Sequence, residues 1–516
     1  MRIYAHFLRY IKKEAIMENI LNVSQMKALD QETIVVKHLP SLVLIENAAN
    51  KVVEFIESNF HKKMKIGIFA GIGNNGADAI AIARILATKD YLVDLYILSN
   101  VKRSKECEEE LLIAENFQVP IFYSLTDRTY DLLIDGIFGI GLNRMISGVF
   151  LEYITFINQS GGVVISLDIP SGINGNNGAI MGAAVKANYT ITFGYKKTGL
   201  LLLEGPNYSG EIICKNIGLF KSKFIDESAY IQSYEKSELP VLPKRKLTGN
   251  KGTFGKVLIF AGSKEYGGAV SLVSLATYRT GSGMVHIITH SENKQMLLEK
   301  NPEALISCYD DKNFPENFHL ILSWADVIVA GPGIGLNKTA KEVFNQMLSF
   351  IDNHRKVPFI IDADALTFLL DNNNLNKIKQ FEHVICTPHV KEFSKLINSS
   401  VQKVKENIIE YVSDFSKKWG VITVCKDAKT FVFEGSSGKS YLNQSGNNGM
   451  ATAGSGDVLA GILASLISQG MPPFNAAYTA VHIHGLAGDF SQQQYGRGMV
   501  ATDLIENMKI FIKENL

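Results

Sequence analysis

Three glycines and two asparagines follow the first strongly apolar run of this sequence. The segment reads Gly71-Ile-Gly73-Asn-Asn-Gly76 and leads directly into an apolar helical stretch. Glycines let a chain turn tightly, and the free amides at the start of a helix attract a phosphate or another anion. The spacing also matches the dinucleotide-binding fingerprint, which is a weak signal by itself. A dehydrogenase would need an acidic residue at the end of the next strand, but Asp94 lies near that strand's beginning.

Carboxylates end two further apolar runs in the first half of the chain. Asp135 and Asp168 each close such a run, and Ser171 follows the second. Ligands of open α/β sheets gather outside the carboxyl ends of the strands, so we expect these side chains to meet Asn75 in one crevice. Oxygen ligands of this kind suit a hard monovalent or divalent cation. Taken alone, each aspartate is better explained as a helix or turn cap, and only the combination favours a site.

A second glycine-dense segment, near the C-terminus, carries a single carboxylate. Between residues 446 and 461 the chain places Asp457 in the sequence Gly-Ser-Gly-Asp at the start of an apolar helix. Successive amides at such a start form an anion hole suited to a transferring phosphoryl group, and the aspartate could act there as a base. The simpler explanation is a first-turn charge that favours the helix dipole. The neighbouring motifs decide between the two interpretations.

Five short motifs accompany this segment, most of them directly after an apolar run, where the site of an α/β protein is built. They lie at residues 250–263, 331–335, 361–366, 387–392 and 426–430. His389 becomes a site candidate through its Thr-Pro-His setting, since a lone loop histidine is usually structural. His482 and His484 stand two apart on a predicted helix, so they face different directions and should not chelate one metal.

The segments that position these motifs alternate between short apolar runs and helical stretches, which is typical of an α/β protein. The apolar runs are nearly continuous, so we expect parallel sheets covered on both faces. After a helical lead-in at 24–60, the predicted strands of the first half are 65–70, 92–98, 132–135, 163–168 and 190–193. From 220 to 247 the pattern gives way to polar residues and two prolines, which predicts a linker. Beyond it the predicted strands are 256–261, 284–289, 327–330, 359–362, 384–387 and 421–425.

The composition limits the kinds of partner. The 516 residues predict two domains, because one hydrophobic core rarely serves so long a chain. Lys and Arg number 52 against 51 Asp and Glu, so no broad field is available to hold nucleic acid or an anionic membrane. The five cysteines form no CxxC pair, and no apolar run approaches the roughly 20 residues that cross a bilayer. We expect a cytoplasmic protein, and we interpret residues 1–16 as a frayed extension rather than a targeting signal.

The motifs of the first half, GIGNNGAD, LIDGIFGIGLNR and SLDIPSGINGNNG, resemble those of NAD(P)HX epimerases, the N-terminal part of bifunctional NAD(P)H-hydrate repair enzymes. The resemblance implies a Rossmann-like three-layer epimerase domain at residues 17–225. It also implies a potassium ion held by Asn75, Asp135 and Ser171, and a catalytic Asp168 at the reacting ring. The implied contacts with NAD(P)HX, the hydrated coenzyme, come from Asn74, Asn75, Gly76, Ala77, Asp78, Gly139, Ile140, Gly141, Leu142, Asn143, Arg144, Met145 and Asp168.

Two residues depart from the epimerase pattern. The family usually has glycines where this chain has Ala77 and Ala79. Alanine tolerates a positive φ poorly and adds a methyl group where backbone approaches ligand, so we expect a slight shift of the loop and a weaker epimerase activity. The non-enzymatic alternative is that this half is a binding module without catalysis.

The motifs of the second half resemble the ribokinase-like, ADP-dependent NAD(P)H-hydrate dehydratases over residues 236–516. The resemblance implies a ribokinase-like three-layer domain in which Asp457 is catalytic. It implies NAD(P)HX contacts from Ala269, Gly335, His389 and Asp457. It implies nucleotide contacts from Lys426, Asp427, Ala428, Lys429, Thr430 and Gly456. This chain has KDAKT and TPHVKE where the family usually has KGAGT and TPHPGE, which we expect to alter contacts on the adenine side.

Together the two resemblances imply repair of hydrated nicotinamide coenzymes. The first half would interconvert R and S NAD(P)HX, and the second would dehydrate the S form to NAD(P)H while cleaving ADP to AMP and phosphate. The expected cofactors are a potassium ion and Mg2+ with ADP. The expected partners are NADHX, NADPHX and ADP, with no nucleic acid and no membrane, in a homo-oligomer. The alternative is a ribokinase-type small-molecule kinase fused to a non-catalytic Rossmann-like module, against which the TPHxxE motif and the fused first domain argue.

Overall fold

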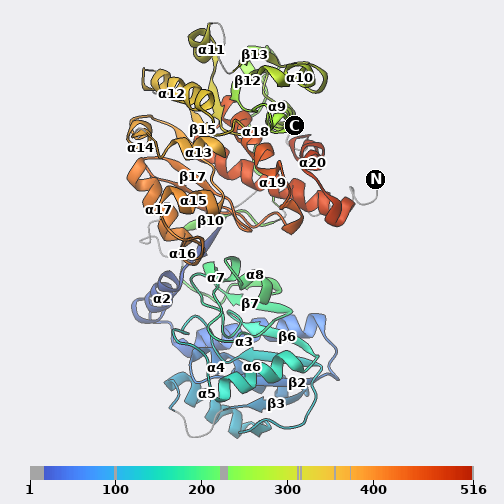
Figure 1. Cartoon of the computed structure of the whole chain (residues 1–516). Helices are drawn as coiled ribbons and strands as arrows, with labels where there is room; N and C mark the ends of the chain where they lie inside the picture. Colours follow the sequence, from blue (N-terminus) through green and yellow to red (C-terminus); the bar gives the residue numbers. More distant parts are fainter. Residues whose placement is uncertain are drawn as a thin grey trace. The chain divides into compact units, whose positions relative to one another are not determined.

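A computed structural model describes residues 17–97, 102–220, 230–236, 238–310, 313, 317–353, 356–371 and 373–513. The chain divides into two compact units, one of residues 19–227 and one formed mainly by residues 228–516 (Figure 1). The expectation for residues 1–16 and the last residue of the strand predicted at 92–98 lie outside the described residues. No helix in the described ranges is long and apolar enough to cross a membrane.

The N-terminal unit is built on a seven-stranded parallel sheet in the order β4-β3-β2-β5-β6-β7-β9. All five predicted strands of this half are present, and β4 and β9 were not predicted. The strands are β2 (Lys65–Ala70), β3 (Leu92–Tyr96), β4 (Ile121–Phe122), β5 (Leu132–Gly136), β6 (Val163–Leu167), β7 (Tyr189–Phe193) and β9 (Glu211–Lys215).

Helices cover both faces of this sheet. Successive side chains of a strand point to opposite faces, so the buried strands contribute to two separate cores. Ile134 and Ile165 pack with α3 (Ser41–Asn59), α4 (Asn74–Thr88) and α5 (Lys105–Asn116) on one face. Leu133 and Val164 pack with α6 (Val149–Gln159) on the other face. The unit is therefore a three-layer α/β domain, as expected from the sequence.

The lead-in to this sheet differs from the single helical stretch predicted at 24–60. It holds β1 (Glu18–Leu21), α2 (Val23–Gln31) and a π-helix at Glu32–Val36, and α3 begins only after Pro40. Asn22 caps α2 through a capping box with Gln25. β1 pairs in parallel with β8 (Lys196–Lys197), which is followed by the short helices α7 (Thr198–Leu201) and α8 (Gly205–Tyr208). A four-residue strand beside a two-residue strand leaves too short a pattern to recognise in sequence.

The C-terminal unit has a larger sheet in the order β13-β12-β11-β14-β15-β16-β17-β18-β19-β10. It is parallel from β13 to β17, after which β18 and β19 add antiparallel strands and β10 pairs in parallel with β19. All six predicted strands are present, and β10, β13, β18 and β19 were not predicted. The bounds are β10 (Ile231–Ser233), β11 (Lys256–Phe260), β12 (Met284–His290), β13 (Leu305–Tyr309), β14 (Val327–Ala330), β15 (Phe359–Ile361), β16 (Val384–Cys386), β17 (Ile422–Cys425), β18 (Phe431–Glu434) and β19 (Ser440–Leu442).

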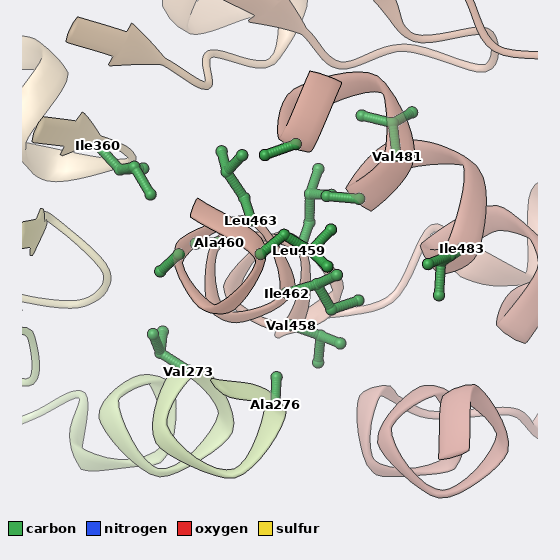
Figure 2. Close-up of a cluster of buried hydrophobic side chains, with 14 of the residues drawn as sticks. Val273, Ala276, Ile360, Val458, Leu459, Ala460, Ile462, Leu463, Val481 and Ile483 are labelled. Carbon is green, nitrogen blue, oxygen red and sulfur yellow. The ribbon is translucent and has the colours of Figure 1, made fainter. Parts of the chain in front are cut away.

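Helix α18 (Ser455–Ser468) lies at the centre of the main core of this unit. It is apolar on nearly every side, as expected of a helix enclosed by other elements. Figure 2 shows its side chains between those of the neighbouring elements: Val458, Leu459, Ala460, Ile462 and Leu463 face Val273 and Ala276 of α9 (Gly267–Thr280), Val481 and Ile483 of α19 (Pro473–Tyr495), and Ile360 of β15. A Cβ at Gly461 would lie 2.4 Å from the carbonyl oxygen of Val273, so glycine permits the close contact between α18 and α9.

The opposite face of this sheet is covered by a second group of helices, which completes three layers. For example, Phe344 of α12 (Lys338–Asn353) contacts Phe359 of β15 and Phe368 of α13 (Asp364–Phe368). The other helices of the unit are α10 (Lys294–Lys300), α11 (Phe318–Trp324), α14 (Asn374–Ile378), α15 (Val390–Leu396), α16 (Val401–Glu406), α17 (Ile408–Trp419) and α20 (Ala501–Lys513).

The linker predicted at 220–247 is wrong for the described residues 231–234. Ile231–Ser233 form β10, and Tyr234 is buried with its ring 6.0 Å from that of Tyr441 and 5.9 Å from that of Tyr478. The proline-containing stretch that follows contributes no further strand among the described residues. The C-terminal unit therefore uses residues that lie ahead of position 236.

We expect the two units to fold independently as fragments 17–225 and 230–516, because each contains its own cores. A fragment that starts at Lys236 loses β10 and the buried Tyr234. Its free energy of unfolding should be lower than that of fragment 230–516 by about 3–5 kcal/mol, the usual effect of removing a large buried aromatic side chain. Urea denaturation followed by circular dichroism would measure this. Equal stabilities, or a fragment 230–516 without a cooperative transition, would contradict this division of the chain.

Candidate active sites

A cavity of about 590 Å³ opens in the N-terminal unit. Most of the residues implied as epimerase contacts line it: Asn74, Asn75, Asp78, Gly139, Ile140, Gly141, Leu142, Asn143, Arg144 and Asp168. Gly76, Ala77 and Met145 do not line it. The turn after β2, the loop after β5 and the end of β6 thus meet at the carboxyl edge of the sheet, as the sequence predicts.

Glycines allow the turn after β2 to touch the loop after β5. A Cβ at Gly71 would lie 1.8 Å from the carbonyl oxygen of Ile137, and one at Gly76 would lie 2.2 Å from that of Gly71. Ala77 and Ala79 do not strain this arrangement, because α4 already begins at Asn74 and neither alanine has a positive φ. Both methyl groups are fully buried. The expected loop shift therefore loses its physical reason.

Asp135 is a fully buried carboxylate held by neutral donors. It accepts hydrogen bonds from Ser166 Oγ (2.8 Å), from the Ser171 amide (2.9 Å) and hydroxyl (2.5 Å), and from the Ile137 amide (3.3 Å). Burial raises the pKa of Asp135, and the hydrogen bonds from Ser171 and Ser166 oppose that shift. No lysine or arginine of the described residues forms an ion pair with it.

Asn75 lies beside the same loop. A Cβ at Gly139 would lie 3.3 Å from Asn75 Oδ1, and Asn75 Nδ2 is buried without a hydrogen-bond partner among the described residues. The Phe138 amide between these positions donates to Ser171 Oγ at 2.8 Å. Asn75 of α4, Asp135 of β5 and Ser171 after β6 therefore all adjoin the loop after β5. A buried carboxylate without a cationic partner, next to amide and hydroxyl oxygens, is a donor set that fits a monovalent cation.

Asp168 is held in an unusual backbone conformation at the cavity wall. Its φ is 64°, in the left-handed region that non-glycine residues rarely adopt and that is often found at functional sites. Its amide donates to the carbonyl of Ile191, and its carboxylate pairs with Lys197 Nζ. Lys197 is almost fully buried and also donates to Phe193 O at 2.9 Å. Lys197 was missed in the sequence, because it is one of two adjacent lysines after a predicted strand and nothing in the sequence distinguishes it from Lys196.

Two further carboxyl groups line this cavity. Asp30 comes from α2, and Asp78 from the first turns of α4. Burial, followed by the charge of Asp168, raises the pKa of Asp30 to about 6. Burial and then the charges of Asp168 and Asp30 raise the pKa of Asp78 well above its ordinary range. Asp30 was not predicted, because the sequence gives no sign that α2 reaches the site.

Asp457 occupies the third position of α18, after Gly454, whose φ is 86°. Burial raises the pKa of Asp457 to about 7, with help from the charge of Asp362 and against the charge of Lys426. Lys426 Nζ donates to Asp362 Oδ1 at 2.8 Å, and a Cβ at Gly456 would lie 3.3 Å from Lys426 Nζ. The ends of β15 and β17 therefore meet the start of α18, and they place a carboxyl group that is half ionised at neutral pH beside a fixed ammonium group.

The Thr-Pro-His loop joins the same group of residues through backbone contacts. The Lys426 amide donates to Pro388 O at 2.8 Å, and the Val390 amide donates to Lys426 O at 3.2 Å. His389 also caps α15, since its Nδ1 accepts from the amides of Lys391 and Glu392. About half of its side chain is exposed. His389 therefore combines a structural contact with a position at the edge of the site.

The turns after β11 and β14 approach from the other side. The Gly335 amide donates to Asp364 Oδ2 at 2.9 Å, and Asp364 is a further carboxylate that raises the pKa of Asp457. The Ser263 amide donates to Gly333 O at 2.6 Å, and a Cβ at Gly333 would lie 3.0 Å from the Cβ of Ala269. Ala269, in the first turn of α9, therefore lies beside the turn that contains Gly333 and Gly335.

Residues 426–430 connect β17 to the antiparallel strand β18. Asp427 and Ala428 are exposed, and Thr430 O accepts from the Asn443 amide at 2.9 Å. Lys429 Nζ donates to Gln444 O at 2.6 Å, and burial, with the charge of Lys236, lowers the pKa of Lys429 to about 8. The loop therefore has two exposed residues and one lysine whose pKa is lowered by burial.

His482 and His484 have separate partners in the core, as their spacing predicts. His482 Nε2 lies 2.7 Å from Glu238 O, and His484 Nε2 lies 3.2 Å from Ser455 Oγ. Burial lowers the pKa of each histidine to about 4. Both are structural.

Comparison with known proteins assigns both units to one family. A sequence model described as NAD(P)H-hydrate dehydratase matches residues 257–509, and one described as YjeF-related protein N-terminus matches residues 41–199. The bifunctional NAD(P)H-hydrate repair enzyme of Coxiella burnetii is 32% identical over 461 residues, which cover 87% of this chain and 90% of that protein. The chain belongs to the family of bifunctional NAD(P)H-hydrate repair enzymes.

The chain is also similar to a further member of the family and to one solved structure. The bifunctional NAD(P)H-hydrate repair enzyme of Dictyoglomus turgidum is 31% identical, over 96% of this chain and 98% of that protein. The crystal structure of an ADP/ATP-dependent NAD(P)H-hydrate dehydratase from Bacillus subtilis, co-crystallised with ATP and Mg2+, is 25% identical over 54% of this chain and 95% of that chain, with a TM-score of 0.46. The family model for the first unit includes Lys197 but begins after Asp30.

Proposed function

We propose that this repair enzyme epimerises R and S NAD(P)HX in its N-terminal unit and dehydrates the S form in its C-terminal unit. Asp457 carries the proposal for the second unit: it opens a buried helix beside Lys426, and its pKa of about 7 makes it both ionisable and basic at neutral pH. Relatives that match this chain over most of its length carry the name of such enzymes. We place the epimerase domain at 17–225 and the dehydratase domain at 236–516, extended toward the N-terminus by β10.

The proposed dehydration couples the loss of water to cleavage of a nucleotide. Hydroxide leaves a reduced pyridine ring poorly, whereas phosphate leaves readily. Asp457 takes the proton of the ring hydroxyl while the oxygen of that hydroxyl attacks the terminal phosphorus of ADP. The bond between this phosphorus and AMP then breaks. The C6–O bond then breaks, phosphate departs with the electron pair, and loss of a C5 proton forms the ring double bond of NAD(P)H.

The residues around Asp457 have distinct proposed roles. Backbone amides at the start of α18, including that of Gly456, stabilise charge on the transferred phosphoryl group. The loop of Lys426, Asp427, Ala428, Lys429 and Thr430 binds the nucleotide, together with Mg2+. Ala269, Gly335 and His389 contact the hydrated coenzyme. A kinase that phosphorylates a stable alcohol is not favoured, because the chain matches repair enzymes along its length.

In the N-terminal unit we propose that Asn75, Asp135 and Ser171 hold a potassium ion. When bound, this ion supplies the positive charge that Asp135 lacks and fixes the loop after β5. Asn74, Asp78 and the residues 139–144 line the cavity and bind the substrate, with Gly76, Ala77 and Met145 as supporting positions. Asp168, held by Lys197, faces the reacting ring. The further proposals are a cytoplasmic homo-oligomer whose substrates are NADHX, NADPHX and ADP.

The direct test is to incubate purified protein with NADHX and either ADP or ATP and to follow the recovery of NADH absorbance. We expect nucleotide-dependent formation of NADH from the S form. NADH should also form from the R form, because epimerisation converts the R form into the S form. ADP should support the faster rate. Absence of NADH formation with both nucleotides would overturn the proposed dehydratase.

Replacing Asp135 by alanine should lower the rate of interconversion of R and S NADHX at least tenfold, because the loop loses the carboxylate that four donors surround. Dehydration of the S form should not change, since Asp457 lies in the other unit. Chromatography of the two epimers measures the first activity. Asp131→Ala, an exposed aspartate just ahead of β5, is the matched control. Equal loss of both activities, or an epimerase that does not respond to potassium, would contradict this site.

A further inference from the structure

The cavity of the N-terminal unit is lined by more acidic side chains than buried basic ones. Asp30, Asp78 and Asp168 line it with one buried cation, Lys197, which pairs with Asp168. Lys27 and Arg144 also line it, but both are exposed to solvent. Two carboxyl groups inside the cavity are therefore left without a buried positive partner among the described residues.

Asp30 lines this cavity because β1, the strand just ahead of α2, pairs with β8 near the C-terminal end of the unit. β1 pairs with β8 so that Leu21 lies opposite Lys197. The capping box of Asn22 then starts α2 immediately after β1, and Met26 and Leu29 are buried beneath the helix. Asp30 consequently lines the same cavity as Lys197, which follows it by more than 160 positions in the chain.

The segment after Asp30 is also irregular. α2 continues into a π-helix at Glu32–Val36, and π-helical segments are frequently found at functional sites. Thr33 Oγ1 donates to Leu29 O at 2.8 Å and accepts from the Phe220 amide at 3.0 Å, which fixes this turn against the end of the unit. Asp30 is therefore held on an anchored helix rather than on a free terminus.

We propose that Asp30 and Asp78 are the proton-transferring pair of this cavity, with Asp78 as the acid and Asp30 as the base in the inversion of the hydrated ring carbon. The inference deepens the proposed epimerase function and depends on it. It gives a catalytic role to Asp30, which lies ahead of the residues that the family model matches.

The two carboxyl groups differ in the way that acid and base roles require. Burial, and then the charges of Asp168 and Asp30, raise the pKa of Asp78 well above its ordinary range, whereas Asp30 has its pKa raised to about 6. Pairs of carboxyl groups whose surroundings separate their pKa values commonly divide acid and base work in this manner. Lys197 opposes both shifts, and Asp168 reinforces both.

The proposed step balances with water as the only added reactant. Asp78 gives its proton to the C6 hydroxyl, the C6–O bond breaks with its electron pair on oxygen, and water departs while the ring nitrogen donates its lone pair to C6. The resulting ring cation is stabilised by the carboxylates of Asp30 and Asp168. A water molecule then adds to the opposite face of C6, its proton passes to Asp30, and proton exchange with solvent restores both carboxyl groups.

The test compares Asp30→Asn with Asp30→Glu, using pure R NADHX and chromatography of the epimers. Asparagine keeps the size but cannot accept a proton, so we expect the enzyme-catalysed rate to fall by about 10² or more. Glutamate keeps the carboxylate, so the rate of Asp30→Glu should be at least tenfold higher than the rate of Asp30→Asn. Glu32→Gln, a neighbouring carboxylate that does not line the cavity, should be neutral. Dehydration of the S form should stay at the parent rate in all three variants.

The pH profile separates a base from a merely structural residue. The parent rate of epimerisation should rise with pH through about 6 as Asp30 ionises, and Asp30→Asn should lack this rise. In H2¹⁸O each inversion should place one solvent oxygen on C6. Inversion without ¹⁸O, or a parent-like rate and profile in Asp30→Asn, would overturn the inference. A parent enzyme that does not accelerate epimerisation at all would instead overturn the proposed function.

Discussion

Replacing Asp457 by asparagine should reduce nucleotide-dependent release of NADH from its hydrate by about 10² to 10⁴ fold, the usual contribution of a general base. Asparagine keeps the size of the side chain and can still accept a hydrogen bond at the start of α18, but it cannot take a proton. The amides of the helix start and the nucleotide loop stay in place. Binding of ADP, measured by calorimetry, should therefore persist while turnover is lost.

The stability of this variant provides an independent check. The pKa of Asp457 is raised from 3.8 to about 7 in the folded chain, so its ionisation opposes folding as the pH rises through this interval. Below pH 4 the carboxyl group is neutral in both states and this penalty disappears. At pH 8 the asparagine variant should therefore be as stable as the parent or more stable, by up to about 4 kcal/mol. Urea denaturation at pH 8 and pH 5 measures the difference.

Asp503 offers a matched control, because it is the third residue of α20 just as Asp457 is the third residue of α18. Its carboxylate accepts from the Val500 amide at 2.8 Å, so Asp503→Asn removes a helix-start charge that is not among the groups that shift the pKa of Asp457. We expect this variant to keep its dehydratase rate. If Asp457→Asn dehydrates the S hydrate at nearly the parent rate, Asp457 is only a first-turn charge and the proposed mechanism is wrong.

The sequence predicted the strands that carry the sites because those strands are buried on both faces. Runs such as residues 132–135 and 359–362 are nearly continuous in apolar residues, and their ends fall within one residue of the observed strands β5 and β15. Topology then places the following aspartates at the same edge of the sheet. The positions of Asp135 and Asp168 at this edge could therefore be predicted from the strands alone, whereas Asp457 follows no strand and was singled out by its glycine-rich motif.

Other residues could not be predicted, since their roles depend on contacts between distant short segments. Asp30 and Lys197 meet through the pairing of β1 with β8, which are too short to show a periodicity. β18 and β19, the antiparallel strands of the larger sheet, were not predicted either. The positive φ considered for Ala77 is absent, because α4 begins before this residue, and the effect of Ala77 on activity stays a prediction. Chain geometry, rather than residue type, decided each of these cases.

Replacing Lys426 by methionine should both destabilise the C-terminal unit and shift the pH dependence of dehydration. Lys426 lies 2.8 Å from Asp362, whose side chain is only 2% exposed. Burial opposes the charge of Lys426, but the carboxylates of Asp362 and Glu392 outweigh it and raise the pKa of this lysine. Methionine has a similar length without the charge. Removing one partner of a buried ion pair typically lowers the free energy of unfolding by about 3–5 kcal/mol, which urea denaturation measures.

The effect on activity has a definite sign. The parent dehydration rate should rise with pH through about 7 as Asp457 ionises, and Lys426 is the group that holds this pKa down. Without the ammonium group, Asp457 should require a higher pH to ionise, so the rise moves to higher pH and activity lost at pH 7 returns in part at pH 9. Lys341→Met removes a more exposed lysine that lies 2.9 Å from Asp371, outside the residues assigned to this site, and it should change neither property. An unchanged stability together with an unmoved pH profile in Lys426→Met would show that this lysine does not control the proposed base.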